Sequence, residues 1–223
     1  MMVNLVKQNF LILSPYAYIG IILGMMVAFL LAIPASFIFV VSFFAIVFSL
    51  YLYDDKNNVY RYIISLPVKK QNMILGRYIY SLIIALFLML ILWGWMGILS
   101  LTPLLTESHY VYNWRDIIVM FSFLSLMFAI GSPILYRLSF YPSSIIIFFL
   151  IGLGSFIYIS EIMKVLGRDD ADIILFNDMD SGLSLLAEKY IPFQPYIILI
   201  AGTFALLYVS MLLANFFVKN SDM

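Results

Sequence analysis

The residues with the chemistry to bind a metal ion are few, and they lie outside the long apolar stretches of the sequence. The single histidine, His109, stands among Tyr110, Tyr112 and Trp114, and the chain contains no cysteine. Tyr and Trp gather where a membrane meets water. A zinc site needs about four ligands, most of them His or Cys. We therefore interpret His109 as a solvated loop residue and predict no metal site.

Carboxylates concentrate in residues 161–194, which carry seven acids and three bases. The string NDMDSG, residues 177–182, has the spaced oxygen ligands of a calcium loop. Counted from Asp178, however, Gly182 is the fifth residue, whereas an EF-hand loop requires glycine at the sixth position. We interpret this stretch as a solvated acidic face. The spacing of its last apolar residues predicts a short amphipathic helix after Ser181.

The elements that must position these residues are apolar. The 223 residues are 65% hydrophobic and 11% charged, whereas globular chains are about 45–50% apolar and about 25% charged. Six stretches contain no Asp, Glu, Lys or Arg: 16–33, 35–53, 78–101, 117–136, 143–160 and 195–218. As helices they are about 27 Å long or more, enough to cross the hydrocarbon core of a bilayer. The predicted fold class is an all-α polytopic membrane protein with six transmembrane helices.

The same stretches exclude several functions. Proton- and ion-coupled carriers keep ionisable residues inside the membrane, and these spans have none. A membrane-embedded enzyme would need a nucleophile with a base, or a metal set, and neither can be assembled. The chain lacks a Gly-x-x-x-x-Gly-Lys-Ser/Thr nucleotide loop, and a net charge of zero argues against a nucleic-acid partner. Energy for any transport must therefore come from another protein.

The distribution of basic residues predicts the orientation. Eight Lys and Arg lie in segments 1–15, 54–77, 137–142 and 219–223, and four lie in the segments on the opposite side. Cytoplasmic loops carry the Lys/Arg excess. We therefore expect both termini in the cytoplasm and a multi-pass location in the plasma membrane, with residues 161–194 forming an extracytoplasmic loop.

The N-terminal region contains two further features. Residues 3–14 place apolar and polar side chains on opposite faces of a helix, which is typical of a helix in the headgroup plane, and Ser14-Pro15 predicts the start of a new helix. Gly20, Gly24 and Ala28 then form a ridge of small residues. Such a ridge lets a second helix approach closely, and that helix belongs either to the same chain or to another subunit in a dimer.

The polar segment 54–77 holds five of the twelve basic residues. Val59, Tyr62, Ile63 and Leu66 have the spacing of a short amphipathic helix, which Pro67 ends. A helix of this kind suits docking against a cytoplasmic protein. The alternative is an interfacial helix lying on anionic lipid.

Two motifs resemble a known family. Residues 65–78, SLPVKKQNMILGRY, resemble the segment that follows the second span in type-2 ABC transporter permeases. Residues 133–139, PILYRLS, resemble the turn between spans four and five in a bacterial branch of that family. Lys69 replaces a common Ser or Thr, and Ser139 replaces the usual Gly. Six spans, an amphipathic N-terminal helix and a long outer loop before the last span also resemble these permeases.

The resemblance implies a single permease domain over residues 1–223, driven by two copies of a cytoplasmic ABC ATPase. ATP and Mg²⁺ would bind to the ATPase, so we expect no cofactor on this chain. A second permease chain, identical or sister, would complete the assembly. The residues that would couple to the ATPase are Tyr62, Ile63, Ser65, Leu66, Pro67, Val68, Lys69, Lys70 and Arg137.

The branch that the chain resembles includes peptide exporters and self-immunity permeases of Gram-positive bacteria, among them the phenol-soluble modulin exporter. The resemblance implies export of hydrophobic or amphipathic cargo, with peptides expected first and lipid-like molecules as an option. Two other functions fit the sequence. One is a six-span substrate-capture subunit of a vitamin uptake system, and the other is a membrane scaffold or sensor subunit that transports nothing.

Overall fold

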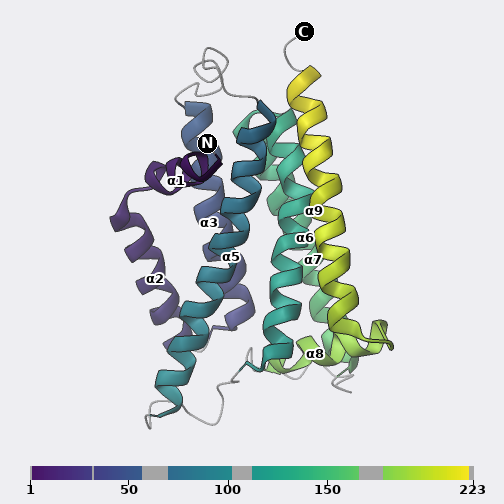
Figure 1. Cartoon of the computed structure of the whole chain (residues 1–223). Helices are drawn as coiled ribbons and strands as arrows, with labels where there is room; N and C mark the ends of the chain where they lie inside the picture. The colour runs from purple at the N-terminus through teal and green to yellow at the C-terminus, as the bar shows by residue number, and fades with distance from the viewer. Residues whose placement is uncertain (1, 32, 57–69, 102–111, 166–177, 221–223) are drawn as a thin grey trace.

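The computed structural model of the chain describes residues 2–31, 33–56, 70–101, 112–165 and 178–220, and the regular elements in these ranges are all α-helices (Figure 1). They are α1 (Met2–Ile12), α2 (Pro15–Leu30), α3 (Ala35–Lys56), α5 (Lys70–Ser100), α6 (Trp114–Arg137), α7 (Phe140–Val165), α8 (Asp178–Tyr190) and α9 (Pro195–Asn220). Each predicted apolar stretch falls largely within one helix, and the all-helical fold class is confirmed.

Four of these helices, α3, α5, α6 and α9, are long and apolar enough to cross a membrane. The pair α1 and α2 passes the same test when taken together, with a bend of 70° between them. Helix α7 contributes a shorter apolar stretch, Phe140–Gly154. The described residues therefore contain four candidate spans, or five with the bent pair. They confirm a multi-pass membrane protein, while the count of six spans stays a prediction.

The bend between α1 and α2 follows from two residues. The Ser14 hydroxyl accepts a hydrogen bond from the backbone N–H of Ala17 at 3.3 Å and so caps α2. Pro15 occupies the first helical turn, where a missing N–H removes no helical hydrogen bond. The predicted start of a new helix at Ser14-Pro15 is confirmed. The placement of α1 in the headgroup plane stays a prediction.

The long helices form two groups that α5 connects. Helices α1 and α2 lie on one side of α5, and α6, α7 and α9 lie on the other, while α3 crosses behind α5 (Figure 1) and contacts α2, α5, α6 and α7. Helices α6 and α9 pack closely along much of their length, and α5 contacts both groups. Helix α8 crosses one end of the second group, at the bottom of Figure 1. We call this end of the bundle the α8 end, and the opposite end, which holds α1, the α1 end.

Aromatic rings fill the space between α3, α5 and α6. The buried rings of Phe43 and Tyr78 both meet Phe128, with ring centroids 6.2 and 5.1 Å away. Edge-to-face pairs of this kind contribute about 0.5–1.5 kcal/mol each beyond the area that they bury. The rings therefore join α3, α5 and α6 to one another in the core.

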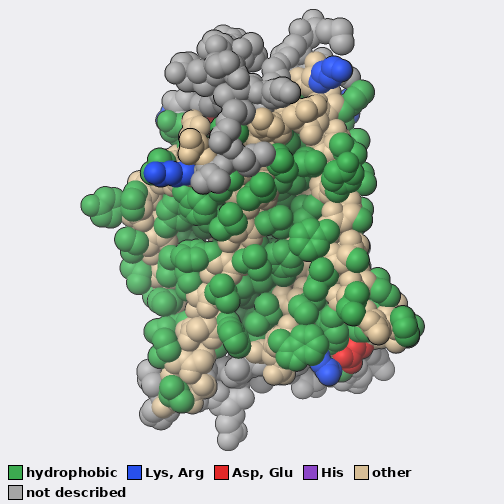
Figure 2. Space-filling view, viewed as in Figure 1, with side chains coloured by type: hydrophobic (Ala, Val, Ile, Leu, Met, Phe, Trp, Pro, Cys, Tyr) green, Lys and Arg blue, Asp and Glu red, His purple; other side chains and the backbone are tan. Residues whose placement is uncertain are grey.

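Charged side chains in the described part of the chain lie near the two ends. Figure 2 shows one face with a broad apolar band between the ends and charged groups only above and below it. The exposed charged residues are Lys7, Asp55, Lys56, Arg137 and Lys219 at the α1 end, and Arg115, Glu188 and Lys189 at the α8 end. The molecule thus has the surface of a protein immersed in lipid.

Candidate functional site

Two buried charges lie at the α1 end, where α3 ends and α5 begins. The Arg77 guanidinium forms an ion pair with the Asp54 carboxylate, and the side chains are only 3% and 1% exposed. Arg77 also lies over the Tyr51 ring, 4.9 Å from its centroid. The Tyr136 ring, at the end of α6, meets Tyr51 edge-on at 5.5 Å and interacts electrostatically with Arg77. We call Tyr51, Asp54, Arg77 and Tyr136 the ion-pair cluster.

The ion-pair cluster corrects the expected bounds of the polar segment 54–77. Helix α3 continues to Lys56 and α5 begins at Lys70, so Asp54 and Arg77 belong to helices rather than to a loop. Neither a glycine nor a proline interrupts residues 51–56, so the helix has no reason to stop at its first charge. Each charge can be buried because the opposite charge of its partner lies beside it.

A second set of polar side chains lies beside this cluster and joins α5, α6 and α9. The Tyr78 hydroxyl bonds to the hydroxyl groups of Ser132 and Ser210, with 2.7 Å to Ser210. The Ser210 hydroxyl also donates to the backbone carbonyl of Ala129 at 2.5 Å. Hydrogen bonds of this kind join helices where surrounding lipid removes the hydrophobic drive for packing. We call Tyr78, Ser132 and Ser210 the hydroxyl cluster.

Removal of the central hydroxyl group should weaken the bundle. Tyr78→Phe deletes hydrogen bonds to two helices while keeping the ring, and we expect the free energy of unfolding to fall by about 1 kcal/mol. Titration with a denaturing detergent in mixed micelles, followed by circular dichroism, measures the change. Tyr208→Phe is the matched control, because Tyr208 is 60% exposed on α9. Equal stability of the two variants would contradict the assigned role of the hydroxyl cluster.

Helix α1 packs against α5 next to the ion-pair cluster. Gly76 is buried, and a Cβ atom placed on it would lie 3.3 Å from the Cβ of Leu5. One turn further along α5, the Tyr80 ring meets Phe10 edge-on at 4.7 Å and its hydroxyl bonds to that of Tyr18 at 2.7 Å. The first residues of α5 are therefore fixed by α1 on one face and by Asp54 on another.

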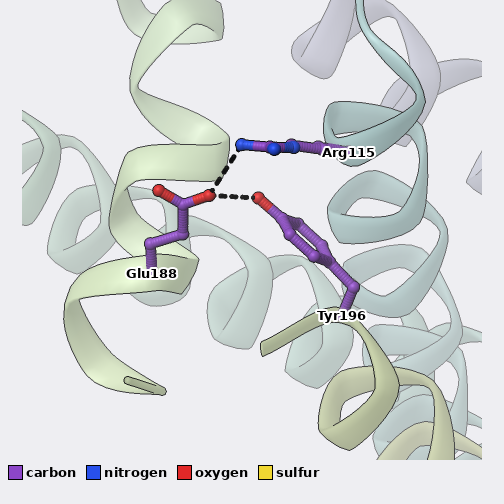
Figure 3. Close-up of polar contacts among 3 residues, drawn as sticks. All are labelled: Arg115, Glu188 and Tyr196. Atoms are coloured by element: carbon purple, nitrogen blue, oxygen red, sulfur yellow. Dashed lines mark hydrogen bonds and ion pairs between the residues drawn. The ribbon is translucent and has the colours of Figure 1, made fainter. Parts of the chain in front are cut away.

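At the α8 end, a polar contact joins α8 to α6 and α9. One oxygen of the Glu188 carboxylate accepts hydrogen bonds from Arg115 at 3.2 Å and from the Tyr196 hydroxyl at 2.7 Å (Figure 3). Lys189 lies 4.0 Å from the Glu161 carboxylate of α7. The expected amphipathic helix after Ser181 is present as α8, which begins at Asp178 and buries Leu183 and Ala187. Two acids of the predicted solvated face thus bind neighbouring helices.

The structure places only some of the predicted site residues. Tyr62, Ile63, Ser65, Leu66, Pro67, Val68 and Lys69 lie outside the described residues. Lys70 is the first residue of α5. Arg137 is the last residue of α6, and its exposed guanidinium lies 5.3 Å from the centre of the Phe217 ring. Their predicted coupling role stays a prediction.

The ridge of small residues on α2 divides between two environments. Gly20 and Gly24 are exposed, with open space where a Cβ atom would lie. Ala28 is partly buried and packs against the apolar core. The two glycines therefore serve no close packing among the described helices, and their predicted role in a dimer stays open to test.

The most informative residues of the site, Asp54 and Arg77, are absent from the predicted set. Each directly adjoins a charge-free stretch, with no helix breaker between them and that stretch. Opposite charges at the facing ends of two consecutive spans are a signal for an ion pair between those spans. A charge beside an apolar stretch is equally typical of the beginning of a loop, so the sequence alone does not distinguish the two.

The described residues form a charge-poor helical bundle of a multi-pass membrane protein, with polar clusters between its helices. Residues 4–219 match the family model described as ABC-2 family transporter protein. The chain therefore belongs to the ABC-2 family and is a membrane subunit of an ABC transporter. No curated protein and no solved structure gives a significant match.

Proposed function

We propose that this chain is the permease subunit of an ATP-driven exporter in the plasma membrane. Two copies of a separate cytoplasmic ABC ATPase would bind ATP and Mg²⁺, and this chain would carry no cofactor. A second permease chain, either identical or sister, would complete the assembly. The α1 end would face the cytoplasm with both termini, because the segments assigned to that side carry eight of the twelve basic residues.

The connection between α3 and α5 at the α1 end carries this proposal. Helix α3 ends at Lys56 and α5 begins at Lys70, and the ion-pair cluster joins these two helices to each other and to α6. A partner that displaced this segment would move several spans at once. Rigid movement of one helical group against another is a common way to alternate between two states of access.

The composition of the spans supports an external source of energy and an amphipathic cargo. The six charge-free stretches offer no ionisable relay for a proton or ion gradient. Hydroxyl groups and aromatic rings suit molecules that are themselves partly apolar. Hydrophobic or amphipathic peptides are the cargo that we propose, in keeping with the resemblance to Gram-positive peptide-export and self-immunity permeases such as the phenol-soluble modulin exporter.

The second permease chain would contact α2. Gly20 and Gly24 face outwards with open space around them. A helix from another chain could approach this surface closely, since neither residue has a side chain. Ala28 would take no direct part, because it already packs within the chain.

Leu66→Asp tests the proposed coupling. The resemblance assigns Leu66 to the contact with the ATPase, so a buried carboxylate there should reduce co-purified ATPase about tenfold or more, in line with the cost of burying an unpaired charge. Affinity purification from the native host in mild detergent, with vanadate-sensitive ATP hydrolysis as the readout, measures this. Leu185→Asp is the matched control, because Leu185 is exposed on α8 at the opposite end.

The same preparations test direction and cargo. Inside-out vesicles with the wild-type chain should accumulate a fluorescent amphipathic helical peptide when ATP is added, and vesicles with Leu66→Asp should not. Equal ATPase recovery and equal accumulation for Leu66→Asp and the wild type would contradict the proposal. Accumulation of a fluorescent phospholipid in place of the peptide would support an ATP-driven exporter but contradict the peptide cargo.

A further inference from the structure

The ion pair between Asp54 and Arg77 differs from the other ion pairs among the described residues. Both of its partners are buried, with 1% of the whole Asp54 residue and 2% of the whole Arg77 residue exposed. The pairs Arg115–Glu188 and Lys189–Glu161 lie at the surface of the α8 end. A buried ion pair is weak evidence for a role in stability, because desolvation of two charges cancels most of their attraction. Another reason for its presence is therefore needed.

A further buried acid shows what an ordinary structural explanation would look like. Asp116 is fully buried, and its carboxylate accepts a hydrogen bond from the backbone N–H of Asn113 at 2.9 Å. Together with Asn113 it forms a capping box at the start of α6. Asp54 has no comparable local role, because it lies in the last turn of α3 rather than at the start of a helix. Its ion-pair partner is on a different helix.

The position of the Asp54–Arg77 pair in the chain suggests why it is there. Asp54 precedes residues 57–69 by one turn of α3, and Arg77 follows them by about two turns of α5. Tyr51 supports the guanidinium from α3, and Tyr136 adds a contact from α6. The pair thus joins the α1 ends of α3 and α5, and Tyr136 adds α6 to the same cluster.

We propose that Asp54 and Arg77 are positioning residues for energy coupling. By holding the α1 ends of α3 and α5 together, they make both helices, with α6, follow any displacement of residues 57–69. Without the pair, the segment moves while the spans stay in place, and ATP is hydrolysed with little motion at the α8 end. The proposal rests on the proposed function, because it requires an ATPase that displaces this segment.

The chain contains no cysteine, so it provides a clean background for distance measurements. Spin labels at Leu101→Cys and Leu185→Cys report on the α8 end. Leu101 directly follows the last residue of α5 and is 87% exposed, and Leu185 lies on α8. The full complex with its co-purified ATPase, in nanodiscs, is compared before and after trapping with ATP and vanadate. The readouts are the rate of ATP hydrolysis and the population with a shifted distance between the labels.

The test variant is Asp54→Asn/Arg77→Gln, which removes both charges and leaves no unpaired one. The matched control is Asp55→Asn/Lys56→Gln, because both of these residues are exposed beside the site. We expect the test variant to assemble and hydrolyse ATP, with the shifted population reduced about tenfold, as a change of about 1.4 kcal/mol between two states would produce. The control should behave like the wild type.

Several outcomes would overturn the inference. A wild-type shift in Asp54→Asn/Arg77→Gln would show that the pair does not couple the helices. If that variant fails to assemble, Arg77→Lys is the second test variant, because it keeps the charge but loses the planar group that covers Tyr51. A wild-type distance shift in Arg77→Lys would equally refute the coupling role. Loss of ATPase assembly in both variants while the chain stays folded would make the pair a structural element. If the wild-type complex itself captures no ATPase, the proposed function fails first.

Discussion

Replacement of Asp54 by alanine is expected to lower the free energy of unfolding by about 3–5 kcal/mol, because it leaves the Arg77 guanidinium buried without its carboxylate partner. Arg77 is 2% exposed and cannot reach solvent without opening the α1 end of the bundle. Unfolding by detergent titration in mixed micelles measures the difference. Asp55→Ala is the matched control, since Asp55 is the next residue and is exposed.

A double variant separates the penalty of the unpaired charge from the value of the pair. Asp54→Leu/Arg77→Met replaces both charges with apolar groups, and buried pairs replaced in this way often leave stability unchanged or increased. We expect it to recover most of the loss. If Asp54→Ala costs no more than Asp55→Ala, Asp54 and Arg77 are hydrated rather than buried, and the ion-pair cluster is wrong.

Gly76→Leu is expected to lower the free energy of unfolding by about 1–3 kcal/mol through overpacking. A Cβ atom at Gly76 already lies 3.3 Å from the Leu5 Cβ and 4.0 Å from its backbone carbonyl carbon. A larger side chain must therefore displace α1 from α5. Detergent unfolding measures the stability, and tryptic cleavage at Lys7 measures how often α1 detaches.

Gly94→Leu is the control for this substitution on the same helix. Nothing lies within 4 Å of a Cβ atom at Gly94, so the new side chain points into open space, and we expect little change in stability. The comparison removes the general effect of replacing glycine in a helix, because both positions gain the same helical propensity. Equal effects at the two positions would contradict the close approach of α1.

The all-helical fold and the order of its apolar helices could be predicted because lipid excludes charge so strongly. Each charge-free stretch is long enough to cross the bilayer, and each corresponds to a helix. The bend at Ser14-Pro15 was also predictable, because cap and proline act within one turn. The ends of α3 and α5 were not. A helix can continue through charged residues when they find partners, as Asp54 and Arg77 do.

The contacts between helices could not be predicted, because they join residues far apart in the sequence. Tyr78 bonds to Ser132 and Ser210, which lie 54 and 132 residues further along the chain. Serines are common in apolar helices, and no local pattern distinguishes these from others that bond within their own helix, such as Ser49 to the Ala45 carbonyl at 2.7 Å. Only the packing of α5, α6 and α9 selects them.

The motifs that carry the family resemblance gain a physical meaning in the structure. Residues 65–78 and 133–139 are well separated in sequence, yet Arg77 interacts with Tyr136 at the α1 end. Gly76, in the first motif, permits the approach of α1. The described parts of the two motifs therefore both contribute residues to the ion-pair cluster. The coupling residues from Tyr62 to Lys69 lie outside the described part of the chain, and their assignment rests on resemblance.

The central claim is that residues near Leu66 contact an ABC ATPase, and site-directed cross-linking tests it most directly. The cysteine-free chain allows a single Leu66→Cys residue to carry a thiol-linked photo-cross-linker in native membranes. We predict one cross-linked product, identified by mass spectrometry as an ATP-binding subunit of an ABC transporter, and no such product from Leu185→Cys. Cross-linking of an ABC ATPase from Leu185→Cys but not from Leu66→Cys would place the ATPase at the wrong end and contradict the account.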